Sequence, residues 1–213
     1  MDGSSRSSPR DFGISNMSHP TSRIQHPTSA DAFEWTAGSV EETQQLGEQV
    51  GRLLQAGDVV ALHGELGSGK TTFVQGLARG LQRDPETIKS PTFVLMREYP
   101  GPVPLVHLDG YRLEGPSSAA WLDVELIFSP QKITVIEWAD RFESLLPEQY
   151  VEARLSHVSA HRRRIVLRPV GERARTIVTQ LQTKMADIRL QPSGTGPTSE
   201  DETKAQGDEI SGD

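Results

Sequence analysis

A glycine-rich segment, HGELGSGKTTF, runs from His63 to Phe73 directly after an apolar stretch. Eight of its residues fit the spacing G-x-x-x-x-G-K-[ST]: Gly64, Glu65, Leu66, Gly67, Ser68, Gly69, Lys70 and Thr71. Glycines let successive backbone N–H groups turn inward around an anion, and the start of a following helix directs its positive end to the same point. The segment therefore predicts a phosphate-binding loop. The alternative is a glycine-rich turn without a chemical role.

The residue types after the glycines indicate which anion the loop binds. A lysine such as Lys70 can reach the β- and γ-phosphates of a nucleotide, and the Thr71 hydroxyl can coordinate Mg²⁺. Thr72 opens the helix beside them. We therefore expect ATP and Mg²⁺ as cofactors, with Lys70 acting in catalysis.

Two acidic residues end apolar segments elsewhere in the chain. Asp109 follows PLVHL, and Glu137 follows ITVI. The carboxyl ends of parallel strands form the ligand-binding edge of an open α/β sheet, so Asp109 is placed where a Mg²⁺-binding aspartate is expected, either in direct contact or through water. The residue after Asp109 is Gly110, so a base or a second metal carboxylate must come from elsewhere, and Glu137 is the best candidate. Both acids also fit ordinary strand ends.

Periodicity in the chain predicts the elements that position these residues. Helical spacing of apolar residues alternates with short apolar or alternating runs, which is typical of an α/β fold. We expect a three-layer P-loop NTPase fold with a mainly parallel sheet and a C-terminal antiparallel hairpin around Ser159 and Ala160. The expected helices are 40–57, 70–82 and 117–128, and the expected strands are 58–64, 92–99, 103–109, 132–138, 150–158 and 162–170.

Composition narrows the class of protein. The chain has 213 residues and no cysteine, so disulfides and thiolate metal sites are excluded. No apolar run approaches the roughly 20 residues of a membrane helix, so we expect no membrane association and a cytoplasmic location. The formal net charge is -7, and the segment 191–213 accounts for most of it, with six acidic residues and one lysine. The sign of the total charge therefore says little about partners.

The two ends of the chain differ in composition from the centre. Residues 1–31 are rich in Ser, Pro, Thr and His, and residues 191–213 are acidic and poor in apolar side chains. Such segments cannot bury enough surface to offset the entropy of ordering. We therefore predict a disordered N-terminal extension (1–31), one P-loop ATPase domain (32–190) and a disordered acidic tail (191–213).

Four motifs together resemble one family. GELGSGKTTF, SPTF (90–93), HLDGYRL (107–113) and IEWADR (136–141), in this order, are similar to the TsaE family, also called YjeE, between about Val40 and Pro169. This family is the small P-loop ATPase of bacterial tRNA threonylcarbamoyladenosine biosynthesis. The chain departs from the family pattern at Gly110, where an apolar residue is usual, and at Ala139, where proline is common.

The resemblance implies roles for individual residues. Lys70 and Thr71 match the phosphate and Mg²⁺ residues, Asp109 matches the metal-binding aspartate, and Glu137 matches a glutamate implicated in metal binding and hydrolysis. Thr92 lies in a loop that resembles a γ-phosphate-sensing switch, and the alternative is a capping or strand-starting threonine after Pro91.

Other residues near these motifs have open interpretations. Trp138 fits core packing or a partner contact. Tyr111 and Arg112 are expected near the nucleotide at the surface. The run HRRR (161–164) is better explained as a solvated strand face than as an RNA contact.

The resemblance also implies partners. The family binds the TsaD–TsaB heterodimer, and its ATP turnover supports repeated threonylcarbamoyl transfer by TsaD to the adenosine next to the anticodon of tRNAs that read codons starting with A. Contact with tRNA is expected only through that complex, and ATP hydrolysis is expected to be slow without it. Two other classes share the P-loop: a small-molecule or nucleoside kinase, and a nucleotide-dependent binding module with negligible turnover.

Overall fold

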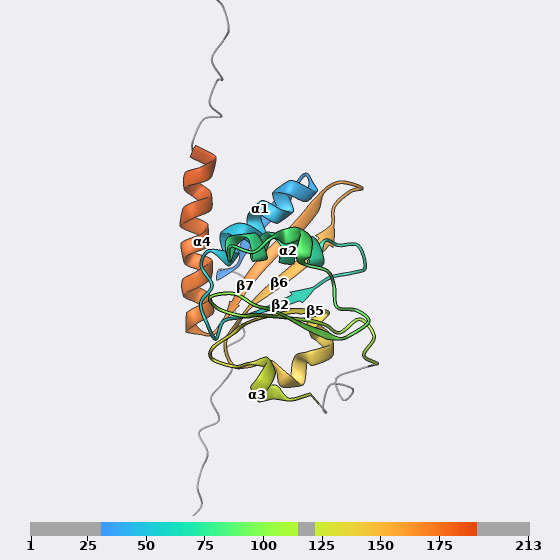
Figure 1. Ribbon diagram of the computed structural model, residues 1–213. Coiled ribbons are helices and arrows are strands. Elements are labelled where there is room, and N and C mark those ends of the chain that lie inside the picture. The colour runs from blue at the N-terminus through green and yellow to red at the C-terminus, as the bar shows by residue number, and fades with distance from the viewer. Residues whose placement is uncertain (1–30, 115–121, 191–213) are drawn as a thin grey trace, which may run out of the picture.

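The computed structural model describes residues 31–114 and 122–190 (Figure 1). Its strands are β1 (Phe33–Ala37), β2 (Val59–His63), β3 (Met96–Tyr99), β4 (Leu105–Asp109), β5 (Ile133–Glu137), β6 (Tyr150–His157) and β7 (Arg163–Val170). Its α-helices are α1 (Val40–Gly51), α2 (Lys70–Gly80), α3 (Val124–Ile127) and α4 (Glu172–Leu190). Two 3₁₀ segments, η2 (Pro85–Thr87) and η4 (Ala139–Leu145), complete the order.

The described strands form one seven-stranded sheet in the order β1-β7-β6-β2-β5-β4-β3. The four central strands β6, β2, β5 and β4 run parallel to one another. β7 pairs antiparallel with both β6 and β1, and β3 pairs antiparallel with β4. The mainly parallel α/β sheet and its C-terminal hairpin are therefore confirmed, with β6 and β7 as the two arms of the hairpin.

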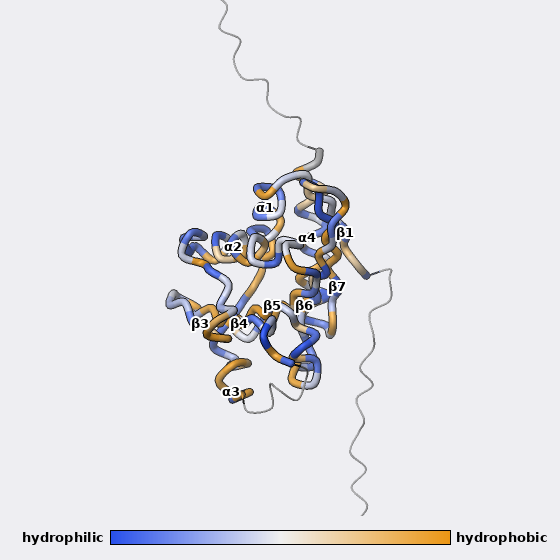
Figure 2. Tube along the Cα trace, turned by 90° about the vertical axis from the view of Figure 1, so that its right-hand side faces the viewer, coloured by the Kyte–Doolittle hydropathy of each residue, from blue (hydrophilic) through white to orange (hydrophobic). Residues whose placement is uncertain are grey.

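Helices cover the sheet from both sides, which gives three layers. In Figure 2 the strands β3 to β7 lie side by side, with α1 and α2 on one side of them and α3 on the other. One core lies between the sheet and helices α1, α2 and α4, and a smaller core lies under α3 and η4. Because β2 and β5 are covered on both faces, their sequences are almost continuously apolar rather than alternating.

Four glycines set the distance between α1 and the P-loop helix α2. Gly47 and Gly51 lie one turn apart on α1, and Gly76 and Gly80 lie one turn apart on α2. A Cβ atom added at any of the four would come closer than 3.0 Å to the backbone of the other helix. The two helices therefore touch along their backbones, and this contact holds α2 in position on the sheet.

Replacing Gly76 with alanine is expected to destabilise the protein. Alanine in a helix is favoured over glycine by about 1 kcal/mol, but the added Cβ would overlap the carbonyl of Gln44, and backbone cannot move aside as a side-chain tip can. We expect a net loss of about 2 kcal/mol and a melting temperature lower by roughly 4 to 8 °C. Gly38→Ala is the matched control, because its Cβ would meet nothing closer than 3.6 Å. Equal melting temperatures for the two variants would contradict the close helix contact.

Several elements differ from those expected. α1 ends at Gly51 rather than at Gly57, and β3 begins at Met96 rather than at Thr92. The amides of Val94 and Leu95 both donate to the Pro91 carbonyl, so residues after Pro91 form a turn before the strand starts. Of the helix predicted at 117–128, only α3 appears within the described residues, and positions 117–121 lie outside them.

Strand β1 and helix α4 were not predicted. The buried residues of α4 do follow a helical period: Ala174, Ile177, Val178, Leu181 and Met185. Arg173 fastens the start of α4 to the sheet with two hydrogen bonds to the Asp58 carboxylate, of 2.9 and 2.7 Å. Among the described helices, none is long and apolar enough to cross a membrane. Apart from Asp31, the predicted extensions 1–31 and 191–213 lie outside the described residues.

Candidate functional site

The glycine-rich loop joins the end of β2 to the start of α2, as predicted. Gly67 and Gly69 have φ angles of 75° and 99°, a region that side chains other than glycine rarely adopt. Gly69 is the N-cap of α2, no side chain caps the helix, and its first turn has no acidic residue. The first N–H groups of α2 are therefore not taken up by a side-chain cap, and the positive end of the helix suits an anion.

Lys70 is held inside this loop. Its side chain is nearly buried, and its ammonium donates to the carbonyls of Gly64 at 2.7 Å and Glu65 at 2.9 Å. The ammonium also lies 4.0 Å from the centre of the Trp138 ring, at a distance suited to a cation–π contact. Burial lowers the pKa of Lys70, and the negative charges of Glu137 and Asp109 act in the opposite direction.

Glu137 connects the end of β5 to the P-loop helix. The Thr71 hydroxyl lies 2.8 Å from Oε1 and 3.0 Å from Oε2 of Glu137. His107, which is fully buried, places its Nε2 atom 3.0 Å from Oε1. The sequence predicted Thr71 and Glu137 as site residues. It did not predict His107, although His107 lies in one of the four motifs.

Asp109, at the end of β4, is held by the loop that precedes β3. The hydroxyls of Ser90 and Thr92 both donate to Oδ2 of Asp109, the latter at 2.6 Å. The backbone N–H of Tyr111 donates to Oδ1 at 2.8 Å. Thr92 therefore touches the predicted metal carboxylate, and Ser90, which was quoted only as part of the motif, does the same.

The two acids lie side by side because β4 and β5 are parallel neighbours. Asp109 and Glu137 are direct partners in the register of the two strands. Leu105, Ile133 and Val135, at alternate positions of the same strands, face the core under α1 and α2. The alternation of a strand therefore directs both carboxylates toward the P-loop helix.

A cavity of about 420 Å³ brings these residues together. Most of the predicted site residues line it: Leu66, Gly67, Gly69, Lys70, Thr71, Thr72, Thr92, Asp109 and Glu137. Ser90, Tyr111 and Trp138 complete the wall. Glu65 and Ser68 do not line it: the Glu65 side chain is exposed, and Ser68 is buried beneath the loop.

The oxygen atoms of this cavity fit Mg²⁺. Two carboxylates and the Thr71 hydroxyl are hard oxygen donors, which Mg²⁺ prefers. In the described part of the chain no group of three or more His, Cys, Asp or Glu side chains could hold a metal by itself. This agrees with the usual mode of Mg²⁺ binding, in which one or two carboxylates act together with substrate phosphates and water.

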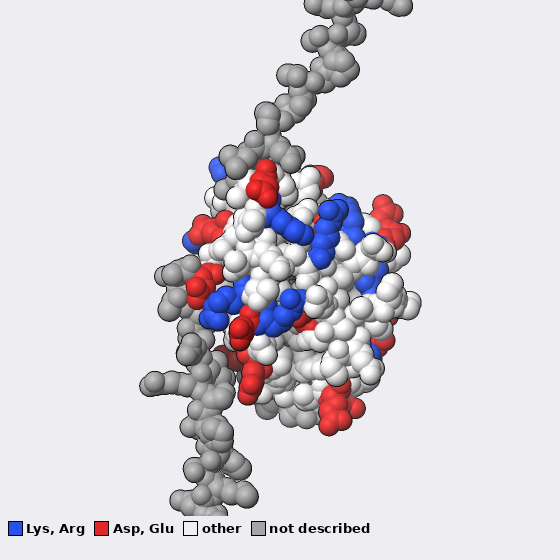
Figure 3. All heavy atoms as spheres, turned by 90° about the vertical axis from the view of Figure 1, so that its left-hand side faces the viewer, with Lys and Arg blue, Asp and Glu red and all other residues white. Residues whose placement is uncertain are grey.

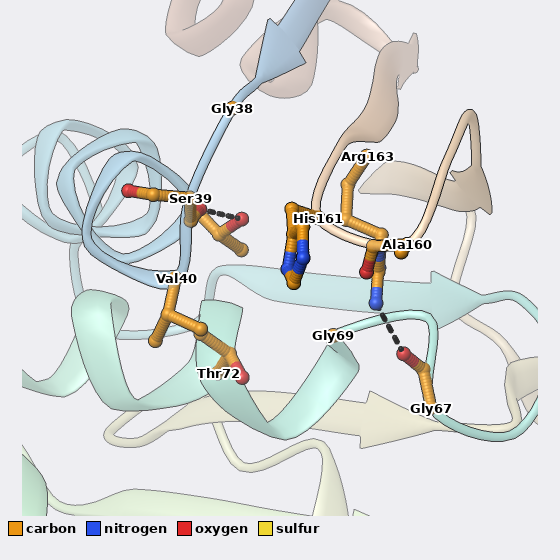
Figure 4. A pocket seen from close by; sticks show the side chains of 10 residues that line it. Gly38, Ser39, Val40, Gly67, Gly69, Thr72, Ala160, His161 and Arg163 are labelled. Atoms are coloured by element: carbon orange, nitrogen blue, oxygen red, sulfur yellow. Dashed lines mark hydrogen bonds between the residues drawn. The ribbon is translucent and has the colours of Figure 1, made fainter.

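A second cavity, of about 430 Å³, adjoins the first (Figure 4). It shares Gly67, Gly69 and Thr72 with the first cavity and extends toward the start of α1 and the β6–β7 hairpin. Arg163 Nη2 lies 3.4 Å from the Gly67 carbonyl oxygen. The remaining wall consists of Gly38, Ser39, Val40, Thr43, Ala160, His161 and Arg163.

The second cavity changes the interpretation of the run 161–164. His161, Arg162 and Arg164 are exposed, as expected for a solvated face. His161 and Arg163, however, also form a wall beside the P-loop, which the sequence did not predict. The basic run was the only feature of the sequence that could have indicated this wall. No local pattern reveals that a hairpin about 90 residues after the loop lies next to it.

Of the motif residues with open interpretations, Tyr111 and Trp138 line the first cavity and Arg112 does not. Trp138 has a left-handed backbone (φ 57°, ψ 49°), and its ring contacts Tyr111 with 5.3 Å between ring centres. Arg112 lies over the ring of Phe93 at 4.4 Å. Trp138 is thus a cavity wall rather than a core residue. A side chain at Gly110 would collide with Phe142 and Arg141, so in this chain Phe142 takes up that space.

Comparisons with known proteins agree with this geometry. The family model described as "Threonylcarbamoyl adenosine biosynthesis protein TsaE" matches residues 37–165. The TsaE protein of Bacillus subtilis is 34% identical over 150 residues, which cover 70% of this chain and 93% of the relative. The TsaE protein of Treponema pallidum is 40% identical over 129 residues, which cover 61% of this chain and 95% of the relative.

A solved structure is also similar. The crystal structure of Bacillus subtilis YdiB superposes with a TM-score of 0.61 and 30% sequence identity, covering 72% of this chain and 96% of that protein. The shared fold is that of a P-loop NTPase. The matched segment 37–165 contains the loop, both strand-end acids and the hairpin wall. The chain therefore belongs to the TsaE family, whose members take part in tRNA threonylcarbamoyladenosine biosynthesis.

Proposed function

We propose that this protein binds ATP with Mg²⁺ and hydrolyses it, and that this turnover serves threonylcarbamoyladenosine modification of tRNA together with TsaD and TsaB. One observation carries the proposal. The P-loop lysine and two strand-end carboxylates line one cavity, and a second cavity continues from the same loop. A triphosphate in the first cavity and its nucleoside in the second would fit these two adjoining spaces.

The first cavity suits the triphosphate. The loop 65–72 offers backbone N–H groups at the start of α2, and Lys70 supplies a positive charge among them. The Thr71 hydroxyl, Asp109 and Glu137 would hold Mg²⁺, and the ion when bound would neutralise charge that develops on the phosphates. The second cavity suits the nucleoside, with Val40 on one side and the hairpin residues His161 and Arg163 on the other (Figure 4).

Glu137 is proposed to act on the attacking water. Its carboxylate is the only one that contacts Thr71 among the described residues, and it lies at the inner wall of the cavity. A carboxylate that orients a water molecule and accepts its proton contributes to hydrolysis in the transition state rather than to binding of the substrate. Asp109, held by two hydroxyls and one backbone amide, has a metal-binding role rather than that of a base.

The proposed tRNA contact is indirect. Surfaces that bind nucleic acid carry a clustered basic stripe. On the face seen in Figure 3, the Lys and Arg side chains of the described residues are interspersed with Asp and Glu. This face therefore offers no clustered basic stripe for tRNA. In the proposed role, TsaD and TsaB hold the tRNA that reads codons starting with A, and this protein supplies ATP turnover in the cytoplasm.

Replacing Glu137 with alanine is the direct test. The Glu137→Ala variant is expected to keep its ATP affinity within a few-fold, because Lys70 and the loop remain, while kcat for phosphate release falls by about 10²- to 10⁴-fold. Binding is measured with a fluorescent ATP analogue and turnover by release of inorganic phosphate. Glu152→Ala is the control, because Glu152 is also a largely buried strand carboxylate but contacts Arg154 and His63 instead of the P-loop.

The same assays separate the proposal from the two other classes. Transfer of phosphate to a small acceptor, instead of release of free phosphate, would indicate a kinase. ATP that stays intact in the wild-type protein, alone and with TsaD and TsaB, would indicate a binding module. Full phosphate release by Glu137→Ala would remove Glu137 from the mechanism while leaving the ATPase proposal in place.

A further inference from the structure

A buried histidine lies next to the proposed catalytic glutamate. His107 occupies the middle of β4 and is 0% exposed. It alternates with Leu105 and Asp109, so it faces the P-loop helix with them. His107 does not line either cavity, so it cannot touch the substrate directly. Any influence on the reaction must pass through a neighbouring group.

That neighbour is Glu137. The distance of 3.0 Å between His107 Nε2 and Glu137 Oε1 is that of a hydrogen bond. For the Glu137 carboxylate to accept this bond, Nε2 has to carry the proton that His107 donates. The other ring nitrogen, Nδ1, is buried and has no hydrogen-bond partner among the described residues. A proton on Nδ1 would therefore be left unsatisfied, which favours the same tautomer.

The glutamate is thus held from two layers of the fold. Thr71, on α2, donates to Glu137 and lies within reach of both oxygens. By itself this contact leaves the carboxylate free to turn about the hydroxyl. His107, on β4, adds a second donor at Oε1 only, so the two oxygens become distinct. Oε1 thus has two neighbouring donors, Thr71 and His107, whereas Oε2 has Thr71 alone.

We propose that His107 is a positioning residue that fixes the orientation of the Glu137 carboxylate for hydrolysis. The proposal rests on the ATPase function proposed above. A misplaced general base loses rate in the transition state while ground-state binding persists. His107 should therefore control kcat and leave nucleotide affinity unchanged. If His107 had a purely structural role, replacing it would instead lower the stability of the protein. Both kcat and the apparent ATP affinity would then change, because less of the protein would be folded.

The test compares three substitutions of His107 in the full chain. His107→Leu removes the donor, and kcat is expected to fall by about 10- to 100-fold, the value of a hydrogen bond to a charged group. His107→Gln places an amide N–H near the position of Nε2 and should recover most of the rate. His107→Asn has a shorter side chain that does not reach Glu137 and should not. The dissociation constant for a fluorescent ATP analogue is expected to stay within about twofold of wild type in all three variants.

A buried polar residue of the same sheet provides the control. Thr134 lies on β5 and is 1% exposed, and its hydroxyl donates to the Ile127 carbonyl rather than to Glu137. Thr134→Val is expected to leave kcat unchanged. Wild-type kcat in His107→Leu, or equal loss of rate in the Gln and Asn variants, would overturn the positioning role.

A spectroscopic measurement tests the contact without any turnover. In the nucleotide-free protein labelled with ¹⁵N-histidine, long-range ¹H–¹⁵N spectra distinguish the two tautomers. We expect His107 to carry its proton on Nε2 and its signals to shift in Glu137→Ala. A proton on Nδ1 alone would overturn the proposal even if His107→Leu does not fold. If the wild-type protein does not hydrolyse ATP but the Nε2 tautomer is found, the ATPase proposal fails and the His107–Glu137 contact stands.

Discussion

Lys70→Ala is expected to weaken ATP binding and to nearly abolish turnover while the protein stays folded. The side chain is the only cation that lines the P-loop cavity in the described part of the chain. Hydrogen bonds to a charged group contribute about 1.5 to 3 kcal/mol, which corresponds to a dissociation constant raised by about 10- to 100-fold. Loss of charge stabilisation in the transition state should lower kcat by roughly a further 10²- to 10³-fold.

The fold should tolerate the loss of Lys70. The lysine bonds to two loop carbonyls, and truncation leaves these carbonyls near a cavity that water can enter. It also removes a desolvated ammonium, whose burial is unfavourable. Isothermal titration calorimetry with ATP measures the affinity, phosphate release measures turnover, and thermal melting measures the stability of the fold. Lys132→Ala is the control, because Lys132 is also largely buried and is paired with Glu98, away from the site. Wild-type affinity and turnover in a folded Lys70→Ala protein would exclude the proposed phosphate site.

Addition of TsaD and TsaB is expected to accelerate ATP hydrolysis by roughly 10³-fold or more. The cavity contains Lys70 but no arginine among its described lining residues, and the residue after Asp109 is Gly110 rather than a glutamate. Beyond Lys70 and the proposed Mg²⁺, the cavity therefore offers no arginine to stabilise charge on the transferring phosphoryl group. Such a site should bind ATP readily and hydrolyse it slowly until a partner supplies or orders the missing group.

Steady-state phosphate release measures this coupling. The purified protein is assayed alone and with the TsaD–TsaB heterodimer from the same organism, each with wild-type and Glu137→Ala protein. Glu137→Ala should bind ATP and the heterodimer, as seen by size-exclusion chromatography, yet gain no activity. Fast hydrolysis by the isolated protein with no response to the heterodimer would contradict the coupling. Failure to bind the heterodimer, with or without ATP, would exclude these partners.

The glycine-rich loop is the part of the candidate site whose local structure sequence alone predicts best. Its residues are contiguous, so the spacing of Gly64, Gly69, Lys70 and Thr71 already specifies a turn that leads into a helix. The apolar runs before Asp109 and Glu137 likewise identify buried strands, and a strand-end acid in an α/β fold is placed at the ligand-binding edge. These inferences depend on short segments, for which local sterics and burial determine the structure.

Local sequence patterns predict the structure less well where a helix or strand is shortened, or is held in place by contacts with distant parts of the chain. Helix α1 stops at Gly51 although apolar residues continue to Leu54, because the amides of Leu53 and Leu54 bond to carbonyls only three residues back, which forms a turn instead of a further helical turn. The segment from Thr92 has the composition of a strand, but Pro91 accepts two amide hydrogen bonds and turns the chain instead. Strand β1 has only five residues and is held by its pairing with β7, more than 120 positions away.

Tertiary structure alone decided which residues meet. The spacing of the motifs does not reveal that β4 and β5 are neighbours in a register that pairs Asp109 with Glu137. It does not reveal that His107 bonds to Glu137, or that Arg163 returns to Gly67 from 96 positions later. Each of these contacts depends on the order of strands in the sheet and on the side to which each strand turns its residues. That order is set by the burial of whole helices and strands against one another, which is a property of the complete chain and not of any segment.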